Sequence, residues 1–310
     1  MQYDITAVGE ILVDMTPAGL DEHGDVRFAR KAGGAPFNLL AAAAKFGMKT
    51  AFFGKVGDDL FGRFLAETVE SAGVGGSIAV DPVYPTTLAF VTLTPDGDRD
   101  FSFYRRFGTD TRLSSDDLDP AVIDASRVFH FGSLSLTDEP AASATRFALE
   151  RAKRAGCVIS YDPNYRAPLW PDEKTAVRKM REYLPYADIV KTSREEALMI
   201  AHEKTVEAAL DFFAASGASV VLVTDGQHPV TAYVHGKTFT VPPHAASTVD
   251  TTGAGDIFFG AFLTGFLKSG TPLAALTAET ARPLVEKATR LAALSTEKHG
   301  AVASIPDWNA

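Results

Sequence analysis

Short apolar runs of strand length alternate with longer stretches of helical periodicity along most of the chain. The strand-like runs are Ile5–Val8, Thr50–Phe53, Val128–Phe131, Val158–Tyr161, Ile189–Lys191 and Val220–Thr224. The helical patterns are Pro36–Phe46, Leu60–Ser71, Ala141–Ala155, Glu173–Leu184, Glu195–Ile200 and Val206–Ala215. This alternation predicts an α/β fold with a mostly parallel central sheet and helices on both faces. No repeat or linker divides the chain, so we expect one domain over residues 1–310.

One region departs from this alternation and predicts a small, separate sheet. Thr87–Leu93 and Phe101–Tyr104 alternate like strands around Pro95-Asp96-Gly97-Asp98, a pattern typical of an antiparallel hairpin. Val26–Arg30 is also strand-like and precedes a Gly-Gly pair. We interpret segments of about 12–31 and 84–112 as an antiparallel β lid. An ordinary β excursion packed on the edge of the main sheet explains the pattern equally well.

The composition favours a small-molecule partner. Among 310 residues, 46% are hydrophobic and 22% charged, and the formal net charge is -9 with a pI near 5.3. Nucleic acids and anionic membranes attract clustered Lys and Arg, so this acidic balance argues against both. No apolar run reaches the roughly 20 residues that span a bilayer, and Met1–Val8 does not resemble a signal peptide. We therefore expect a cytoplasmic protein.

Neither cysteine nor histidine predicts a metal centre. The chain has a single cysteine, Cys157, so no disulfide can form within one chain. Cys157 lies in an apolar run, which favours a buried thiol. The seven histidines are scattered without ligand spacing.

The most informative motif is Asp250-Thr251-Thr252-Gly253-Ala254-Gly255-Asp256, which an apolar run of helical length follows. Two glycines let the backbone approach a ligand, and free N–H groups at a helix start suit phosphate oxygens. A carboxylate repels phosphate, so Asp256 is better suited to accept a proton from an attacking hydroxyl. A plain glycine turn with a capping aspartate remains an alternative.

Two other nucleotide motifs fit this chain poorly. A dinucleotide-binding turn would need a third glycine where Phe258 stands, and no clear strand precedes Gly253. A P-loop at Gly236-Lys237-Thr238 would need glycine at Thr231.

The heptapeptide closely resembles the C-terminal signature of the ribokinase-like (PfkB) family of sugar kinases. Six further segments resemble motifs of that family and occur in the family's order. They are Ala32–Asn38, Gly54–Gly62, His130–Ser133, Asp162–Arg166, Ser193–Glu196 and Thr224–Gly226. The resemblance covers essentially the whole chain and implies a ribokinase-like fold with ATP-dependent phosphorylation of a sugar hydroxyl.

The resemblance also implies roles for individual residues. Asp256 matches the catalytic base, and Gly253, Ala254 and Gly255 match the anion hole for the transferring phosphoryl group. Positions that hold the sugar are Asp14, Gly33, Gly34 and Asn38, to which we add Arg105 in the lid and Arg166. Asp14 could instead be only a turn residue.

On the nucleotide side, the resemblance assigns Asn164, Lys191, Ser193, Thr224 and Gly226 to ATP. Glu196 matches a glutamate that organises Mg²⁺ through water. Ser193 stands where asparagine is common, so a helix cap is an alternative for it. Pro229 replaces a frequent glycine and makes the path of the nucleotide loop uncertain. The stretch Leu291–Ser304 resembles the family's helix beside the adenine and the loop after it, and Asp250, Thr252, Gly300 and Ser304 match a site for a monovalent cation such as K⁺.

Fructose is the favoured sugar, because the segments around Gly33, His130 and Asp162–Trp170 resemble fructokinases. Relatives that phosphorylate 2-keto-3-deoxygluconate carry Tyr and Arg in the lid, so Tyr104 and Arg105 keep that alternative open. A sugar-binding regulator without catalysis is a third possibility, against which Asp256 and its glycines are intact. The lid also predicts a contact between two copies of the chain, as in a homodimer.

Overall fold

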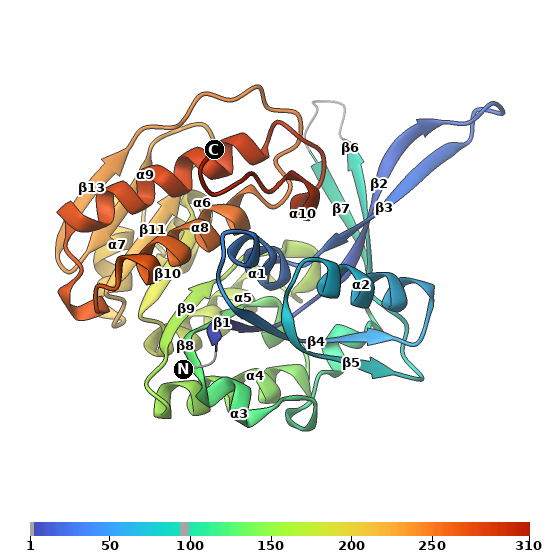
Figure 1. Ribbon diagram of the computed structural model, residues 1–310, viewed down its shortest axis with the longest axis horizontal. Coiled ribbons are helices and arrows are strands. Elements are labelled where there is room, and N and C mark those ends of the chain that lie inside the picture. Colours follow the sequence, from blue (N-terminus) through green and yellow to red (C-terminus); the bar gives the residue numbers. More distant parts are fainter. Residues whose placement is uncertain (1–2, 94–98) are drawn as a thin grey trace.

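The computed structural model describes residues 3–93 and 99–310, which form one large and one small β-sheet (Figure 1). The large sheet has the strand order β13-β12-β11-β10-β9-β8-β1-β4-β5. Its strands are β1 (Tyr3–Val8), β4 (Thr50–Gly57), β5 (Gly75–Asp81), β8 (Ser126–Gly132), β9 (Val158–Asp162), β10 (Ile189–Ser193), β11 (Val220–Thr224), β12 (Val230–Val234) and β13 (Lys237–Val241). All neighbours from β5 to β11 pair in parallel, whereas β12 and β13 are antiparallel.

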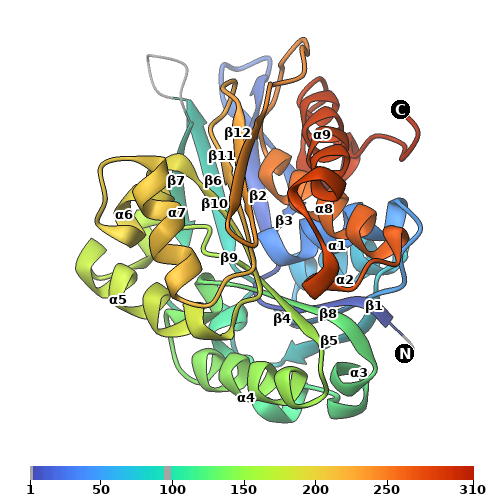
Figure 2. The same ribbon diagram turned by 90° about the vertical axis from the view of Figure 1, so that its left-hand side faces the viewer.

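Helices cover both faces of this sheet (Figure 2). On one face lie α1 (Ala35–Lys45), α2 (Leu60–Ser71), α8 (Ala254–Ser269) and α9 (Ala278–Ser295), and on the other α3 (Pro120–Asp124), α4 (Ala141–Arg154), α5 (Glu173–Tyr183), α6 (Arg194–Ala201) and α7 (Val206–Ala215). The central strands carry runs of buried residues because alternate residues enter two different cores. In β11, Val220 and Leu222 face α8 and α9, whereas Val221 and Val223 face the opposite helices.

The predicted fold class is confirmed, although several elements were not predicted. Strands β5, β12 and β13, helix α3 and most of helix α9 lie outside the predicted runs. β13 alternates exposed and buried residues over five positions, too few for a clear signal. Helix α9 contains Pro283, a residue that normally argues against a helix interior.

The small sheet has the strand order β3-β2-β6-β7 and projects from the main body (Figure 1). Its strands are β2 (Leu12–Leu20), β3 (Val26–Gly33), β6 (Leu88–Leu93) and β7 (Arg99–Tyr104). The predicted hairpin is confirmed by the antiparallel pairing of β6 with β7, and β2 and β3 form a second antiparallel hairpin. The two hairpins meet in parallel through β2 and β6, so the sheet is mixed. The predicted turn Pro95–Asp98 lies outside the described residues.

Most predicted site residues lie where parallel strands end, which is the edge at which open α/β sheets bind ligands. β9 ends at Asp162, β10 at Ser193 and β11 at Thr224, and these strands are neighbours. The helix after the glycine motif, α8, begins at the same edge. No helix in the described part of the chain is long and apolar enough to cross a membrane.

Candidate active site

Asp256 lies in the first turn of α8, and its carboxylate is held by Asn38 of α1. Asn38 Nδ2 donates to Asp256 Oδ2 over 2.9 Å. The helix is positioned firmly because its residues from Ile257 to Leu267 are buried. Asn38 Oδ1 is buried and has no hydrogen-bond partner among the described residues, so it can accept a bond from a ligand hydroxyl.

The pKa of Asp256 is raised from 3.8 to about 6, first by withdrawal from water and then by the nearby Asp162 carboxylate. The Lys191 ammonium, the hydrogen bond from Asn38 and the charge of Arg166 oppose this shift. The carboxyl group therefore titrates close to neutral pH. That pKa suits a group that takes a proton from a hydroxyl.

Lys191, in the middle of β10, places a fixed positive charge beside the glycine turn. Its Nζ donates to Asp162 Oδ2 over 2.9 Å, and both side chains are buried. A Cβ atom added at Gly255 would lie 2.8 Å from this ammonium. The absence of a side chain at position 255 thus leaves room for Lys191, and an anion bound at the turn lies next to it.

The turn itself is formed by the three residues predicted as the anion hole. Gly253 has a φ of 77°, a left-handed conformation that favours glycine, and a Cβ there would lie 2.5 Å from that of Ala301. The Ala254 N–H donates to Thr251 O over 3.2 Å. The next N–H groups belong to the first helical turn and have no acceptor within the helix, which suits them to an anion.

The predicted sugar residues converge on the same region. Asp14 is buried, and a Cβ at Gly33 would lie 2.2 Å from its Oδ2. Gly34, with a φ of 114°, passes so close to the Glu10 carbonyl that a Cβ would lie 2.4 Å from it. Both glycines are therefore needed for β2, β3 and the start of α1 to meet here.

Glu10 is a residue of this region that the sequence analysis missed. Its Oε1 accepts the Ala35 N–H over 3.0 Å, and Oε2 is buried without a partner among the described residues. Burial raises its pKa to about 7, against opposing hydrogen bonds and the charge of Arg105. A charged residue inside the apolar stretch from Val8 to Val13 was the available signal.

The two predicted arginines have different surroundings. Arg105 follows β7 and is 5% exposed. Its Nε donates to Asp110 Oδ2 over 2.6 Å, and its two terminal nitrogens donate to Thr137 Oγ1 and to the Leu134 carbonyl. Most of the Arg105 donors are thus already engaged by other residues of the chain. Arg166 is half-buried, and its charge acts on Asp256.

A cavity of about 590 Å³ opens beside the glycine turn and contains the predicted nucleotide loop. It is lined by Thr224, Gly226, Gln227, His228, Val230, Pro243, His244, Ala245, Ala246, Thr248, Thr251, Ala254, Gly255, Phe258, Thr289, Ala292, Ala293 and Thr296. The mostly small and apolar lining beside Gly255 suits a flat base with its phosphates at the turn. The path at Pro229 is resolved: a turn at Asp225–His228 leads directly into β12.

Part of this lining was not predicted. The segment Pro243–Thr248 has no secondary structure and no recognisable motif, so the sequence offered no signal for it. Ala292, Ala293 and Thr296 fall within Leu291–Ser304, the stretch that the family resemblance places near the adenine.

Glu196 and Ser193 form a capping box at the start of α6, which confirms the helix cap for Ser193. Glu196 Oε2 accepts bonds from the Ser193 N–H and Thr192 Oγ1, and Oε1 accepts the Tyr165 N–H. With most of its acceptor sites filled, Glu196 fits a metal-bound water better than a direct Mg²⁺ bond. Asn164 adopts a left-handed backbone conformation and directly precedes Tyr165, whose N–H binds Glu196.

The residues of the predicted monovalent cation site are brought together by Asp250. Its Oδ1 accepts the Thr252 N–H over 2.8 Å and its Oδ2 the Gly300 N–H over 2.9 Å. Ser304 is buried at the end of the short helix α10 (Ala301–Ser304). The carboxylate thereby joins two loops whose carbonyl oxygens could surround a cation.

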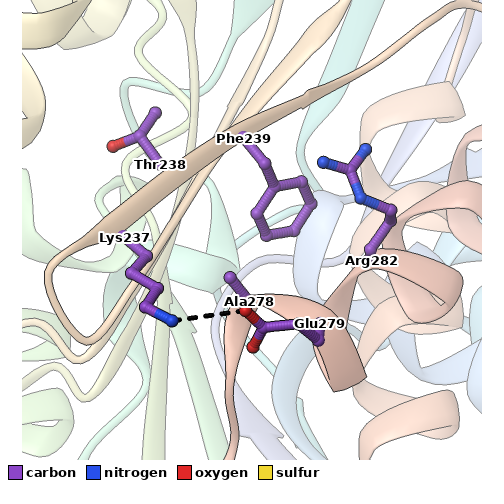
Figure 3. A pocket seen from close by; sticks show the side chains of 6 residues that line it. All are labelled: Lys237, Thr238, Phe239, Ala278, Glu279 and Arg282. Atoms are coloured by element: carbon purple, nitrogen blue, oxygen red, sulfur yellow. Dashed lines mark hydrogen bonds and ion pairs between the residues drawn. The ribbon is translucent and has the colours of Figure 1, made fainter.

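A second cavity, of about 350 Å³, lies far along the sheet at its β13 edge (Figure 3). It is lined by Lys237, Thr238, Phe239, Ala278, Glu279 and Arg282, and an ion pair of 3.2 Å joins Lys237 to Glu279. None of the predicted site residues lines it. The rejected P-loop candidate at Gly236 belongs to this edge, where it forms the turn between β12 and β13.

Comparison with known proteins identifies the family. Residues 2–308 match the model of the pfkB family of carbohydrate kinases. The chain belongs to this family. It is 38% identical to fructokinase-1 of Zea mays over 97% of this chain and 94% of that protein. As a pfkB-family member it is a phosphotransferase that acts on a sugar hydroxyl.

Solved structures of this family agree with the fold. A fructokinase of Xylella fastidiosa with bound ATP has a TM-score of 0.91 and 32% identity over 99% of this chain and 96% of that one. A double mutant of the fructokinase of Vibrio cholerae O395, with fructose, ADP and a potassium ion bound, has a TM-score of 0.88 and 28% identity over 98% of this chain and 96% of that one. The ribokinase-like fold is therefore confirmed.

Proposed function

We propose that this pfkB-family kinase is an ATP-dependent fructokinase that converts D-fructose to fructose 6-phosphate. The observation that carries the proposal is the Asn38–Asp256 pair beside the Gly253–Gly255 turn, where a base and an anion site adjoin. The fructokinase relatives support fructose as the sugar.

In the proposed reaction, the C6 hydroxyl of the sugar attacks the γ-phosphorus of ATP while its proton passes to Asp256 Oδ. The new O–P bond forms as the bond to the β-phosphate oxygen breaks, and ADP leaves with that oxygen. Phosphoryl transfer needs positioning and charge stabilisation rather than a covalent intermediate. Asp14 and Asn38 would hold the sugar hydroxyls, and Lys191 with the turn would bind the phosphoryl oxygens.

The metal and nucleotide assignments are part of the same proposal. Mg²⁺ would sit on the phosphates and reach Glu196 through water, and it would neutralise charge on the transferring group. Asn164 and Thr224 would lie along the phosphates and Gly226 at the nucleotide. A monovalent cation would bind at the Asp250 carboxylate bridge and raise the positive potential of the adjoining turn. These placements fit the hydrogen bonds described above.

We further propose that residues 1–310 act as one kinase domain whose small sheet closes over the sugar and pairs with that of a second copy. The face of this sheet away from Asp14 carries exposed Leu20, Val26, Phe28 and Tyr104. Phe90 links Phe28 and Tyr104 through two edge-to-face ring contacts. An apolar patch of this kind commonly marks a protein contact. The proposed compartment is the cytoplasm.

The deciding experiment measures ADP release with a panel of sugars, with ATP, Mg²⁺ and either K⁺ or Na⁺. We expect fructose to give the highest kcat/KM and K⁺ to raise it. Preference for 2-keto-3-deoxygluconate would replace the proposed substrate. Absence of turnover with every sugar would favour the regulator without catalysis.

A further inference from the structure

Lys31, on strand β3 of the small sheet, has no role in the site described so far. It lies directly opposite Asp14 of β2 in the antiparallel register. Directly opposed residues of antiparallel strands place their side chains on the same face. Lys31 therefore belongs to the face that carries Asp14, the carboxylate proposed to hold the sugar, and not to the apolar outer face.

The end of the Lys31 side chain lies against the loop that covers the glycine turn. A Cβ atom added at Gly300 would be 3.1 Å from Lys31 Cδ and 3.4 Å from its Nζ. The next residue, Ala301, is the one whose Cβ would be 2.5 Å from a Cβ at Gly253. The Gly300–Ala301 segment thus lies against both the Lys31 side chain and the glycine turn, whose other glycine, Gly255, lies beside Lys191.

Lys31 and Lys191 differ in how their charges are balanced. The Lys191 ammonium is paired with the Asp162 carboxylate at 2.9 Å. Lys31 is half-buried, and within residues 3–93 and 99–310 its ammonium makes no hydrogen bond or ion pair. The neighbouring Arg30 has a partner within the chain, because its guanidinium lies 4.3 Å from the centre of the Phe64 ring. A partly buried ammonium that forms no ion pair within the described residues is suited to an anionic ligand.

We propose that Lys31 is a second cation of the phosphoryl site, carried by the small sheet, whose ammonium contacts a terminal oxygen of the transferring phosphoryl group. The inference rests on the proposed sugar kinase activity. The phosphoryl group over the Gly253–Gly255 turn then lies between Lys191 of the main sheet and Lys31 of the small sheet. Because Asp14 and Lys31 share one face, sugar binding and delivery of this charge are coupled.

In this arrangement the small sheet contributes to charge stabilisation as well as to sugar binding. Charge that develops on the transferring phosphoryl group is stabilised by preorganised cations in a site with little water. Lys191 supplies such a charge at all times, whereas Lys31 supplies it when the small sheet lies over the site. Hydrolysis of ATP without sugar is then slowed, because the second cation is in place only when sugar holds the sheet there.

The test compares Lys31→Met with Lys31→Arg and with Arg27→Met. Arg27 lies four residues outward on β3 and on the same face, and it is exposed, so its loss removes one positive charge from the small sheet without touching the site. For each variant, turnover is measured with fructose. Calorimetry then gives affinities for fructose, for fructose 6-phosphate with ADP, and for inorganic phosphate with ADP.

We expect Lys31→Met to lower kcat at least tenfold and to weaken the affinities for fructose 6-phosphate and inorganic phosphate by a similar factor. Its fructose affinity should stay within about twofold of the wild type, Lys31→Arg should recover most of the loss, and Arg27→Met should match the wild type. Equal losses for fructose and fructose 6-phosphate would overturn the proposal, because they would indicate a role toward sugar hydroxyls or folding. Behaviour like that of Arg27→Met would overturn it as well.

Failure of the proposed function is distinguishable from failure of this inference. A wild type that phosphorylates no fructose removes the proposed substrate. The affinity for inorganic phosphate with ADP does not depend on which sugar reacts, and its loss in Lys31→Met alone would still support the phosphoryl contact.

Discussion

The floor of the site and the small sheet above it hold their polar groups in different ways. In the floor, Asp256 is bonded to Asn38 and Lys191 to Asp162, and these partners come from α1, α8, β9 and β10. In the small sheet, Phe28 and Tyr104 are exposed on one face. On the other face the Lys31 ammonium has no partner within the described residues. The charged groups of the floor are thus paired within the chain, whereas in the small sheet the Lys31 ammonium and the exposed rings have no such partner among the described residues.

This difference separates the groups suited to catalysis, in the floor, from those suited to close over the substrate, in the small sheet. Catalysis by positioning needs groups that do not reorganise during the reaction, which the bonded floor provides. Elements that close over a substrate need lower local stability and unsatisfied surface. We therefore expect changes in the floor to cause the largest losses of kcat. Changes in the small sheet should alter binding, assembly or stability, apart from the smaller loss of kcat expected for Lys31→Met.

The largest expected effect is that of Asp256→Asn in the floor. The amide keeps the size of the side chain and can still interact with Asn38, but it cannot take the hydroxyl proton. We expect kcat to fall by about 10²–10⁴ while the fructose affinity measured by calorimetry changes little. Near-normal turnover would show that Asp256 is not the base.

The next effect concerns Arg105, at the junction of the two regions. Arg105→Ala leaves Asp110 buried without its partner, which for a buried pair costs roughly 3–5 kcal/mol of unfolding free energy. Urea denaturation measures this loss, and Arg106→Ala, its exposed neighbour, is the matched control. Substituting Asp110 by Asn in the Arg105→Ala background should recover part of the stability.

The same variant also tests the acid-sugar alternative. Since most donors of Arg105 are engaged within the chain, its loss should change kcat/KM for fructose and 2-keto-3-deoxygluconate by similar factors. A wild-type preference for the acid sugar that collapses selectively in Arg105→Ala would instead place this guanidinium on the substrate carboxylate.

A smaller effect is expected from pH. The base must be deprotonated to act, and its pKa is raised from 3.8 to about 6 in the free enzyme. We expect kcat/KM for the sugar to fall about tenfold for each pH unit below 6 and to be constant just above it. A profile that stays flat down to pH 5 would contradict a raised pKa at Asp256. Lys191→Met should move the acidic fall of this pH profile to higher pH, because it removes a positive charge that favours the Asp256 carboxylate.

The smallest effect is expected for assembly through the outer face of the small sheet. Phe28→Ser removes a 39% exposed ring that contacts Phe90, and Ala29→Ser is the control on the opposite face. We expect Phe28→Ser to weaken a dimer about tenfold, which corresponds to about 1.4 kcal/mol, measured by analytical ultracentrifugation. A wild type that is monomeric at micromolar concentration would contradict the proposed pairing.

The sequence by itself determined the class of fold, the family and the residues of the glycine motif. The first four residues of β11, Val220–Val223, are all apolar, because alternate residues face two cores, and such runs are visible without a structure. The turn at Gly253 is similarly explicit, because its left-handed backbone favours glycine whatever surrounds it.

Only the tertiary structure decided how residues distant in sequence meet. Asn38 and Asp256, or Lys31 and Gly300, are brought together by the packing of separate elements, and no local pattern records such contacts. The same holds for Arg105, whose place in the sequence suggested a ligand contact, whereas its hydrogen bonds are made to Asp110, Thr137 and Leu134. A charged side chain looks alike in sequence whether its partner is a ligand or the chain itself, and only its contacts in the folded structure distinguish the two.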